Sequence, residues 1–200
     1  MNGIRIAMWS GPRNISTALM RSFENRSDTV VIDEPFYAHY LDKGGIDHPG
    51  KGKIILSGSG TIKIDGSLKA PSTGDINITS DTLSLGGTID VSDDLPGSIT
   101  ITSKGELSVS GSILADSQNN TGGTIELTSP SIMQMDKSLI SANGTNGGSI
   151  ALSGNTIISS GTLSSNGSTA KGGRIDIEGT NSNISNLESK KLKILKLESN

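Results

Sequence analysis

A short segment near the amino terminus carries the side chains best suited to bind an anion. Gly11-Pro12 marks a turn, and the apolar periodicity of Ile15–Glu24 predicts a helix directly after it. The first turn of a helix presents unpaired N–H groups to a phosphate or sulfate. The residues that would contribute to such a site are Gly11, Arg13, Asn14, Ser16 and Thr17. The other interpretation of this segment is an ordinary helix start, with a Ser or Asn as N-cap.

Two predicted strands flank this helix and would position the loop. Ile4–Trp9 precedes it and Thr29–Ile32 follows it, so the order is β–loop–α–β. That order is the opening unit of a parallel α/β sheet. Met1–Trp9 is too short and too polar for a signal peptide, so the chain as written is also compatible with the cytoplasm.

The same segment resembles the opening of bacterial sulfotransferase-like proteins. The resemblance covers about residues 3–50 and runs from Ile6-Ala7-Met8-Trp9 through Gly11-Pro12-Arg13-Asn14 to the Asp33-Glu34-Pro35 stretch. In that family the strand–loop–helix holds the 5′-phosphosulfate of the donor PAPS, and Arg13, Ser16 and Thr17 match its loop, whereas Asn14 and Ile15 depart from it. The resemblance implies that Gly11, Arg13, Asn14, Ser16 and Thr17 are what remains of a PAPS loop.

Four further side chains in this region could be imagined as an acid/base or metal set, namely Asp33, Glu34, His39 and His48. Asp33-Glu34-Pro35 is better interpreted as the end of a strand, and two histidines nine residues apart in a loop-rich stretch are usually solvated. No nucleophile–base pair is indicated. We therefore expect neither a catalytic residue nor a metal ligand here.

The composition changes abruptly near Gly50. All five aromatic residues precede position 41, whereas 21 of the 26 glycines and 43 Ser or Thr follow position 50. This asymmetry predicts two parts of different origin, 1–50 and 51–200, joined in a hybrid chain. The net charge of −3 provides no basic field for nucleic acid. No apolar run approaches the ~20 residues of a transmembrane helix, and there is no cysteine.

The second part is a repeat of about 25 residues. An alternating apolar pair recurs at Ile76/Ile78, Ile99/Ile101, Ile125/Leu127, Ile150/Leu152 and Ile175/Ile177. Each repeat holds two more short apolar segments, so it contains three alternating strands. Ile, Leu and Val are expected to face inward, and Ser, Thr, Asp, Lys and Asn are expected to face outward. The pattern predicts a mostly β fold, a right-handed parallel β-helix of about six coils. A disordered linker and an antiparallel sandwich are the alternatives.

Two details of the repeat make specific predictions. The second apolar pair of the fourth coil is Ile132 with Met133 or Met135, and that of the fifth is Ile157/Ile158. The glycines are expected at the corners, in backbone conformations that other residues avoid. A narrow interior of stacked aliphatic residues would explain why this part has no aromatic ring.

The Gly-Gly-x-Ile-x-Ile pattern resembles filamentous-haemagglutinin-like exoproteins. The rounds Gly97–Gly123, Gly123–Gly148 and Gly148–Gly173 carry it best. Such proteins are passengers of two-partner secretion and serve as adhesins or stalks. The resemblance implies a secreted or cell-surface location, an outer-membrane secretion partner and a host-surface or carbohydrate ligand.

Three functions follow from these patterns. The first is a non-enzymatic structural and adhesion module that carries an inactive sulfotransferase-like fragment and needs no cofactor. The second is a PAPS-dependent sulfotransferase. The third is a carbohydrate-active β-helix, for which clustered carboxylates would be needed. The acidic residues of the repeat do not share one repeat phase, and they include Asp90, Asp116, Asp136, Asp176 and Glu178.

Overall fold

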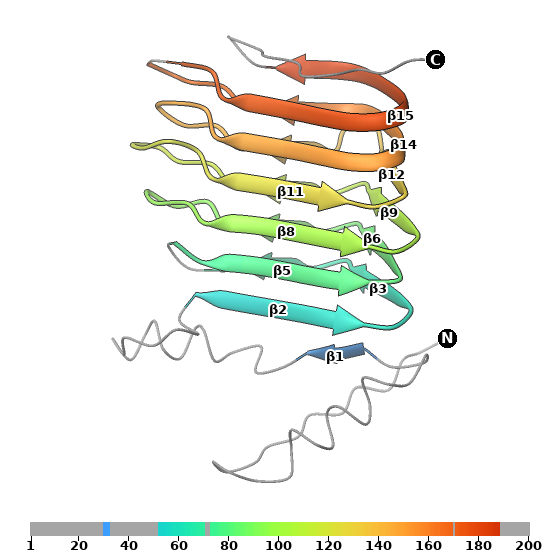
Figure 1. Cartoon of the computed structure of the whole chain (residues 1–200). Helices are drawn as coiled ribbons and strands as arrows, with labels where there is room; N and C mark the ends of the chain where they lie inside the picture. Colours follow the sequence, from blue (N-terminus) through green and yellow to red (C-terminus); the bar gives the residue numbers. More distant parts are fainter. Residues whose placement is uncertain (1–29, 33–51, 71–72, 170, 189–200) are drawn as a thin grey trace, which may run out of the picture.

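The second part of the chain folds into a parallel β-solenoid. The structure is a computed structural model that describes residues 30–32, 52–70, 73–169 and 171–188. All described regular elements are strands, and they form one sheet that winds around itself. Figure 1 shows successive coils stacked along a single axis. The predicted parallel β-helix is therefore confirmed, while its right-handed sense remains a prediction.

Three strands from each coil build three faces. Face 1 contains β2 (Lys53–Gly58), β5 (Asp75–Ser80), β8 (Ser98–Ser103) and β11 (Thr124–Thr128). Face 2 contains β3 (Thr61–Ile64), β6 (Thr82–Leu85), β9 (Glu106–Val109) and β12 (Ser131–Gln134). Face 3 contains β4 (Ser67–Lys69), β7 (Thr88–Asp90), β10 (Ser112–Leu114) and β13 (Leu139–Ser141).

Two long strands complete the stack. β14 (Ser149–Ser164) pairs with β11, β12 and β13, so it runs along all three faces. β15 (Arg174–Glu188) pairs in parallel with β14 over nearly its whole length. The four coils of face strands plus these two make six coils and five coil-to-coil steps.

The register between coils follows the repeat seen in the sequence. Aligned isoleucines in face 1 advance by 22, 23, 26, 25 and 25 residues, through Ile54, Ile76, Ile99, Ile125, Ile150 and Ile175. Neighbouring strands lie about 4.8 Å apart, so equivalent side chains stack directly on one another. The alternating apolar pairs therefore set the register of the whole solenoid.

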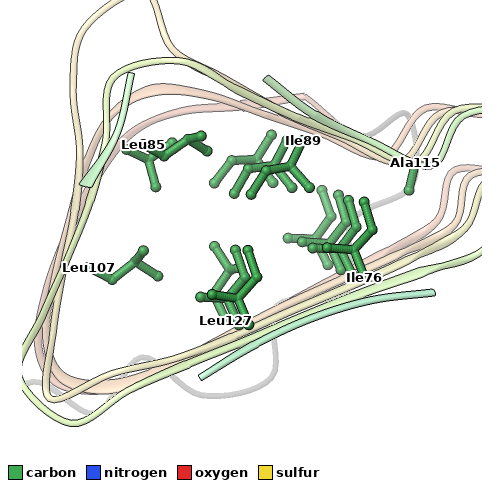
Figure 2. Close-up of a cluster of buried hydrophobic side chains, with 14 of the residues drawn as sticks. Ile76, Leu85, Ile89, Leu107, Ala115 and Leu127 are labelled. Atoms are coloured by element: carbon green, nitrogen blue, oxygen red, sulfur yellow. The ribbon is translucent and has the colours of Figure 1, made fainter. Parts of the chain in front are cut away.

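The interior is a set of aliphatic columns. Figure 2 shows these side chains enclosed by the three sides of the coil, with Ile76 above face 1 and Ile89 and Leu85 opposite. Ile76, Ile99, Ile125 and Ile150 are fully buried, as are Leu107 and Ile113. In the columns that contain Ile76 and Leu107, each of the first five coils places an isoleucine or a leucine, and this regularity explains an interior built without aromatic rings.

One prediction about the core is wrong. Strand alternation turns Met133, Met135 and Ile158 outward, and Met135 and Ile158 are more than one-third exposed. The inward positions belong instead to Gln134 and Ser159, which are almost completely buried. Ser159 Oγ donates to Gln134 Oε1 at 2.5 Å, and Gln134 Nε2 donates to Thr162 O at 3.0 Å. A buried polar pair is tolerated because each member satisfies the other.

A short strand lies at the amino-terminal end of the stack. β1 (Val30–Ile32) pairs antiparallel with β2, with Val30 opposite Gly58 and Ile32 opposite Leu56. The predicted strand is thus confirmed over these three residues, and its described partner is the first strand of the solenoid. β1 thereby covers the edge of β2 (Figure 1). The predicted strand Ile4–Trp9 and helix Ile15–Glu24 lie outside the described residues.

Candidate functional surface

The residues predicted to bind an anion cannot be placed. Gly11, Arg13, Asn14, Ser16 and Thr17 all lie outside the described residues, as do Asp33, Glu34, His39 and His48. The assignment of these five residues to a PAPS loop therefore remains a prediction. Candidate functional groups within the described part lie on the outside of the solenoid and at its corners.

A column of hydroxyl side chains runs along the outside of face 1. Register pairs Ser57 with Thr79, Thr79 with Thr102, Thr102 with Thr128 and Thr128 with Ser153. We call these five residues the hydroxyl column. Thr79, Thr102 and Thr128 are exposed, and strand stacking spaces successive hydroxyls by about 4.8 Å. Each hydroxyl can donate one hydrogen bond and accept others, so the column presents a regular row of neutral polar groups.

A second polar column lies at the corner that follows face 3 and has a structural role. Asp116 N donates to Ser92 Oγ at 2.9 Å, and Asn143 N donates to Asp116 Oδ1 at 2.6 Å. One coil further, Asn166 N donates to Asn143 Oδ1 at 2.7 Å. We call Ser92, Asp116, Asn143 and Asn166 the corner ladder. The side chains of Ser92, Asp116 and Asn143 each accept a backbone N–H of the next coil, so the ladder satisfies turn backbone that would otherwise lack a partner.

The acidic side chains of the repeat occupy different positions of the coil. Asp90 lies on face 3 and aligns with Leu114, whereas Asp176 lies on face 1 and aligns with Ala151. Asp116 belongs to the corner ladder. Among the described residues no group of three or more His, Asp or Glu side chains is arranged to hold a metal ion. The prediction that these carboxylates do not share one repeat phase is confirmed by the register.

Asp90 on face 3 accepts two hydrogen bonds, one at each carboxylate oxygen. Lys69 Nζ donates to its Oδ2 at 2.9 Å, and the Ser92 backbone N–H donates to its Oδ1 at 2.8 Å. Burial opposes ionisation of this carboxyl group, but the hydrogen bonds from Lys69 and Ser92 outweigh it. The pKa of Asp90 is therefore held below its ordinary value of 3.8. Ionised Asp90 links face 3 to the start of the corner ladder.

Asp90 gives the solenoid a stability that depends on pH. The pKa of Asp90 is lower in the folded chain than in the unfolded chain, so ionised Asp90 adds to the free energy of unfolding. This contribution is complete above about pH 5 and is lost as the pH falls through and below 3.8. We expect Asp90→Asn to lower the free energy of unfolding at pH 7. The variant should also lose less stability than the wild type between pH 7 and pH 3, measured by urea unfolding at each pH.

A matched substitution tests whether this effect belongs to Asp90. Asp65 also pairs with a lysine, Lys63, at 2.9 Å, but both side chains are about two-thirds exposed. Exposed ion pairs contribute little to stability, so Asp65→Asn should leave the pH profile unchanged. Equal profiles for the wild type and Asp90→Asn would contradict the assignment.

The described part of the chain contains no helix that is long and apolar enough to cross a membrane.

Comparison with known proteins points to the amino-terminal part. A family model described as a sulfotransferase domain matches residues 4–70. Two proteins of Arabidopsis thaliana, described as branched-chain-amino-acid aminotransferase-like proteins 1 and 2, are each 48% identical to the chain over 50 residues. That alignment covers 25% of this chain and 9% of either relative, so the chain spans a small fraction of their length. No solved structure matches the chain.

The family match supports the resemblance to a sulfotransferase seen in the sequence. It ends at residue 70, so it runs past Gly50 and includes β2, β3 and β4. Those three strands are the first coil of the solenoid and carry the same inward pattern as the later coils. The boundary at 50/51 between two domains therefore remains a prediction.

Two features of the surface were missed by sequence reasoning. The corner ladder joins residues that are 23 to 27 positions apart, so only the coil register brings them together. The recurrence of Asn-Gly at Asn143-Gly144 and Asn166-Gly167 was a signal that could have indicated it. The hydroxyl column was visible in part, because Ser and Thr were expected to point outward.

Proposed function

We propose that the solenoid is a non-enzymatic structural and adhesion module of a surface or secreted protein, of the haemagglutinin-like kind. The observation that carries this proposal is the hydroxyl column on face 1, a repeated neutral surface on a rigid stack. A carbohydrate chain offers a matching series of hydroxyl groups. In the described part, other outward polar groups contact one another, as in the Lys104–Asp81 ion pair, the Thr61–Thr82 hydroxyl pair and the hydrogen bond from Ser98 Oγ to Asp75 Oδ1.

The binding expected of such a surface is weak at each coil and strengthened by repetition. The described solenoid contains no aromatic ring on which a sugar could stack, so contacts would be mainly hydrogen bonds worth about 0.5–1.5 kcal/mol each. Several neighbouring coils that engage one polymer raise the overall affinity without any new type of contact. A polysaccharide is therefore a better ligand for this surface than a single sugar.

Substitution of the hydroxyl column tests the adhesion proposal. Thr79, Thr102 and Thr128 are changed together to valine, which keeps the shape and β-propensity of threonine but removes its hydroxyl. We expect binding to an immobilised polysaccharide panel to fall by at least about tenfold, because three hydrogen bonds are lost. Biolayer interferometry measures binding, and a reducing-sugar assay on the same samples should detect no released sugar.

The control for this experiment is a triple substitution on the other faces. Thr82 and Thr156 lie on face 2 and Thr88 lies on face 3, so changing them to valine removes three hydroxyls away from the column. This variant should bind like the wild type. An equal loss of polysaccharide binding in both triple variants, or no binding by the wild type, would contradict the proposal. Release of sugar would favour a carbohydrate-active β-helix.

We further propose that the amino-terminal segment is an inactive sulfotransferase-like fragment, so that the chain is a hybrid. From Asp75 onward the chain builds solenoid coils. A single β–loop–α–β unit cannot cover both faces of a parallel sheet. The remaining elements of an α/β domain therefore have no counterpart in the described residues 75–188.

The match to a sulfotransferase domain over residues 4–70 favours a second function, transfer of a sulfuryl group from PAPS. Isothermal titration calorimetry of the full chain with PAPS distinguishes an inactive sulfotransferase-like fragment from a functional sulfotransferase. We expect no saturable binding. Binding that is lost in Arg13→Ala but kept in Arg26→Ala, which changes an arginine outside the loop, would support the sulfotransferase.

A further inference from the structure

The carboxyl-terminal end of the solenoid presents a strand edge. Among the described residues β15 pairs with β14 alone, whereas β2 at the other end pairs with β1 as well as β5. Figure 1 shows β15 as the last strand of the stack. A strand edge presents a row of backbone N–H and C=O groups, which is a template for pairing with another chain.

The backbone of β15 determines which residues face this edge. Arg174 N donates to Gly148 O of the preceding corner at 2.9 Å, so Arg174 directs its backbone groups toward β14. Alternate residues of a parallel strand share that direction. Ile175 and Ile177 therefore direct their backbone N–H and C=O groups away from β14, toward the edge of β15 that no other described strand pairs with, while their side chains are buried inside the coil.

This arrangement suits antiparallel pairing of the edge with a copy of itself. If the two-fold axis passes through Asp176, Ile175 of one copy lies opposite Ile177 of the other. Both residues offer their backbone groups, so they form the hydrogen-bonded pairs of an antiparallel ladder. The same register keeps all four isoleucine side chains on the inner side of the sheet.

The charged side chains of the edge are complementary in the same register. Arg174 and Glu178 are exposed on the outside of face 1, and each would lie opposite the other from the second copy. Opposite charges at directly facing positions stabilise a strand pair. A symmetric dimer uses the same surface twice, so the contact would occur at two equivalent places.

We propose that the edge of β15 is a self-association surface, through which two copies join end to end by antiparallel pairing of Arg174–Glu178. β1 covers the equivalent edge of β2, so carboxyl-terminal ends meet each other rather than stacking head to tail.

One residue opposes this dimer and thereby provides a test. Asp176 lies on the two-fold axis, so it would face Asp176 of the second copy. Its Oδ2 accepts a hydrogen bond from Arg174 Nε, while its Oδ1 is buried and has no hydrogen-bond partner in the described structure. Replacing it by asparagine removes the like charges and supplies a donor. We therefore expect Asp176→Asn to tighten the dimer by several fold.

Charge reversal gives the decisive experiment. In Arg174→Glu the facing pair becomes Glu–Glu, and in Glu178→Arg it becomes Arg–Arg, so each variant alone should be a monomer. Mixing the two restores a Glu–Arg pair at both contacts. We expect sedimentation velocity of the full chain at low salt to show a dimer for the wild type, monomers for each variant and a dimer for the equimolar mixture.

Control measurements keep the result interpretable. Lys104 is an exposed lysine paired with Asp81 away from the edge, so Lys104→Glu should leave the dimer intact. Circular dichroism should show the same strand content in every variant. A wild-type monomer at the highest concentration would overturn the proposal. Dimers that persist in both single variants would also overturn it.

Discussion

Replacing Gly111 by alanine is expected to lower the free energy of unfolding by about 2–3 kcal/mol, because the coils leave no room for a side chain there. A Cβ at this position would lie 1.9 Å from the backbone oxygen of Gly87, which belongs to the coil below. Gly111 N also donates to Leu85 O at 3.1 Å, so the two coils cannot separate without loss of a hydrogen bond. Urea unfolding monitored by circular dichroism measures the change.

Gly66 provides a matched control for this substitution. It occupies the equivalent corner of the first coil, and nothing lies within 4 Å of a Cβ built on it. Neither Gly66 nor Gly111 has a positive φ, so the two substitutions differ mainly in available space. Gly66→Ala should change stability by no more than about 0.5 kcal/mol. A similar loss in both variants would show that close stacking is not what requires Gly111.

These glycines correct one interpretation of the sequence. The repeat predicted their positions at the corners, but their role was assigned to unusual backbone conformations. Of the described glycines only Gly52 and Gly60 have a positive φ. Gly87, Gly97 and Gly111 are needed because the backbone of the adjacent coil passes within van der Waals distance. A contact between coils depends on register, and a single repeat does not reveal it.

Much of the solenoid could be predicted because its core positions repeat. Ile99, Ile125 and Ile150 occupy one phase of the sequence and one column of the interior. The exception at Gln134 could not be predicted, because Met133 and Met135 beside it looked like the inward apolar residues. Only the hydrogen bond between Gln134 and Ser159, 25 residues later, explains how a polar side chain occupies that column.

The candidate site could be predicted only in part. The family match supports the sulfotransferase-like character of the first segment, but Arg13, Ser16 and Thr17 lie outside the described residues. On the solenoid, outward Ser and Thr were expected, yet their alignment into the hydroxyl column depends on spacings that vary from 22 to 26 residues. A one-residue slip would turn those side chains inward.

Asn143→Ala should have the second large effect on stability, because Asn143 is the most connected member of the corner ladder. Its Oδ1 accepts hydrogen bonds from Asn166 N at 2.7 Å and from Ser164 Oγ at 2.8 Å, and its Nδ2 donates to Ser141 Oγ at 2.8 Å. Ser141 and Ser164 are buried. Alanine leaves the Asn166 N–H and the Ser164 hydroxyl without this acceptor, and each unsatisfied group costs about 1–3 kcal/mol.

We therefore expect Asn143→Ala to lower the free energy of unfolding by about 3 kcal/mol in urea. Asn143→Asp separates the acceptor role from the donor role. It keeps both acceptor contacts, but it places a carboxylate oxygen where Nδ2 donated to Ser141 Oγ, and the one proton of that hydroxyl is already donated to Asp116 Oδ1 at 2.5 Å. The lost donor and this repulsion together should cost about 1–2 kcal/mol, which is still less than the loss caused by alanine. Asn119→Ala, which removes an exposed hydrogen bond to Asp94, should have little effect. If Asn143→Asp were as unstable as Asn143→Ala, acceptance of the next coil's N–H would not be what the ladder provides.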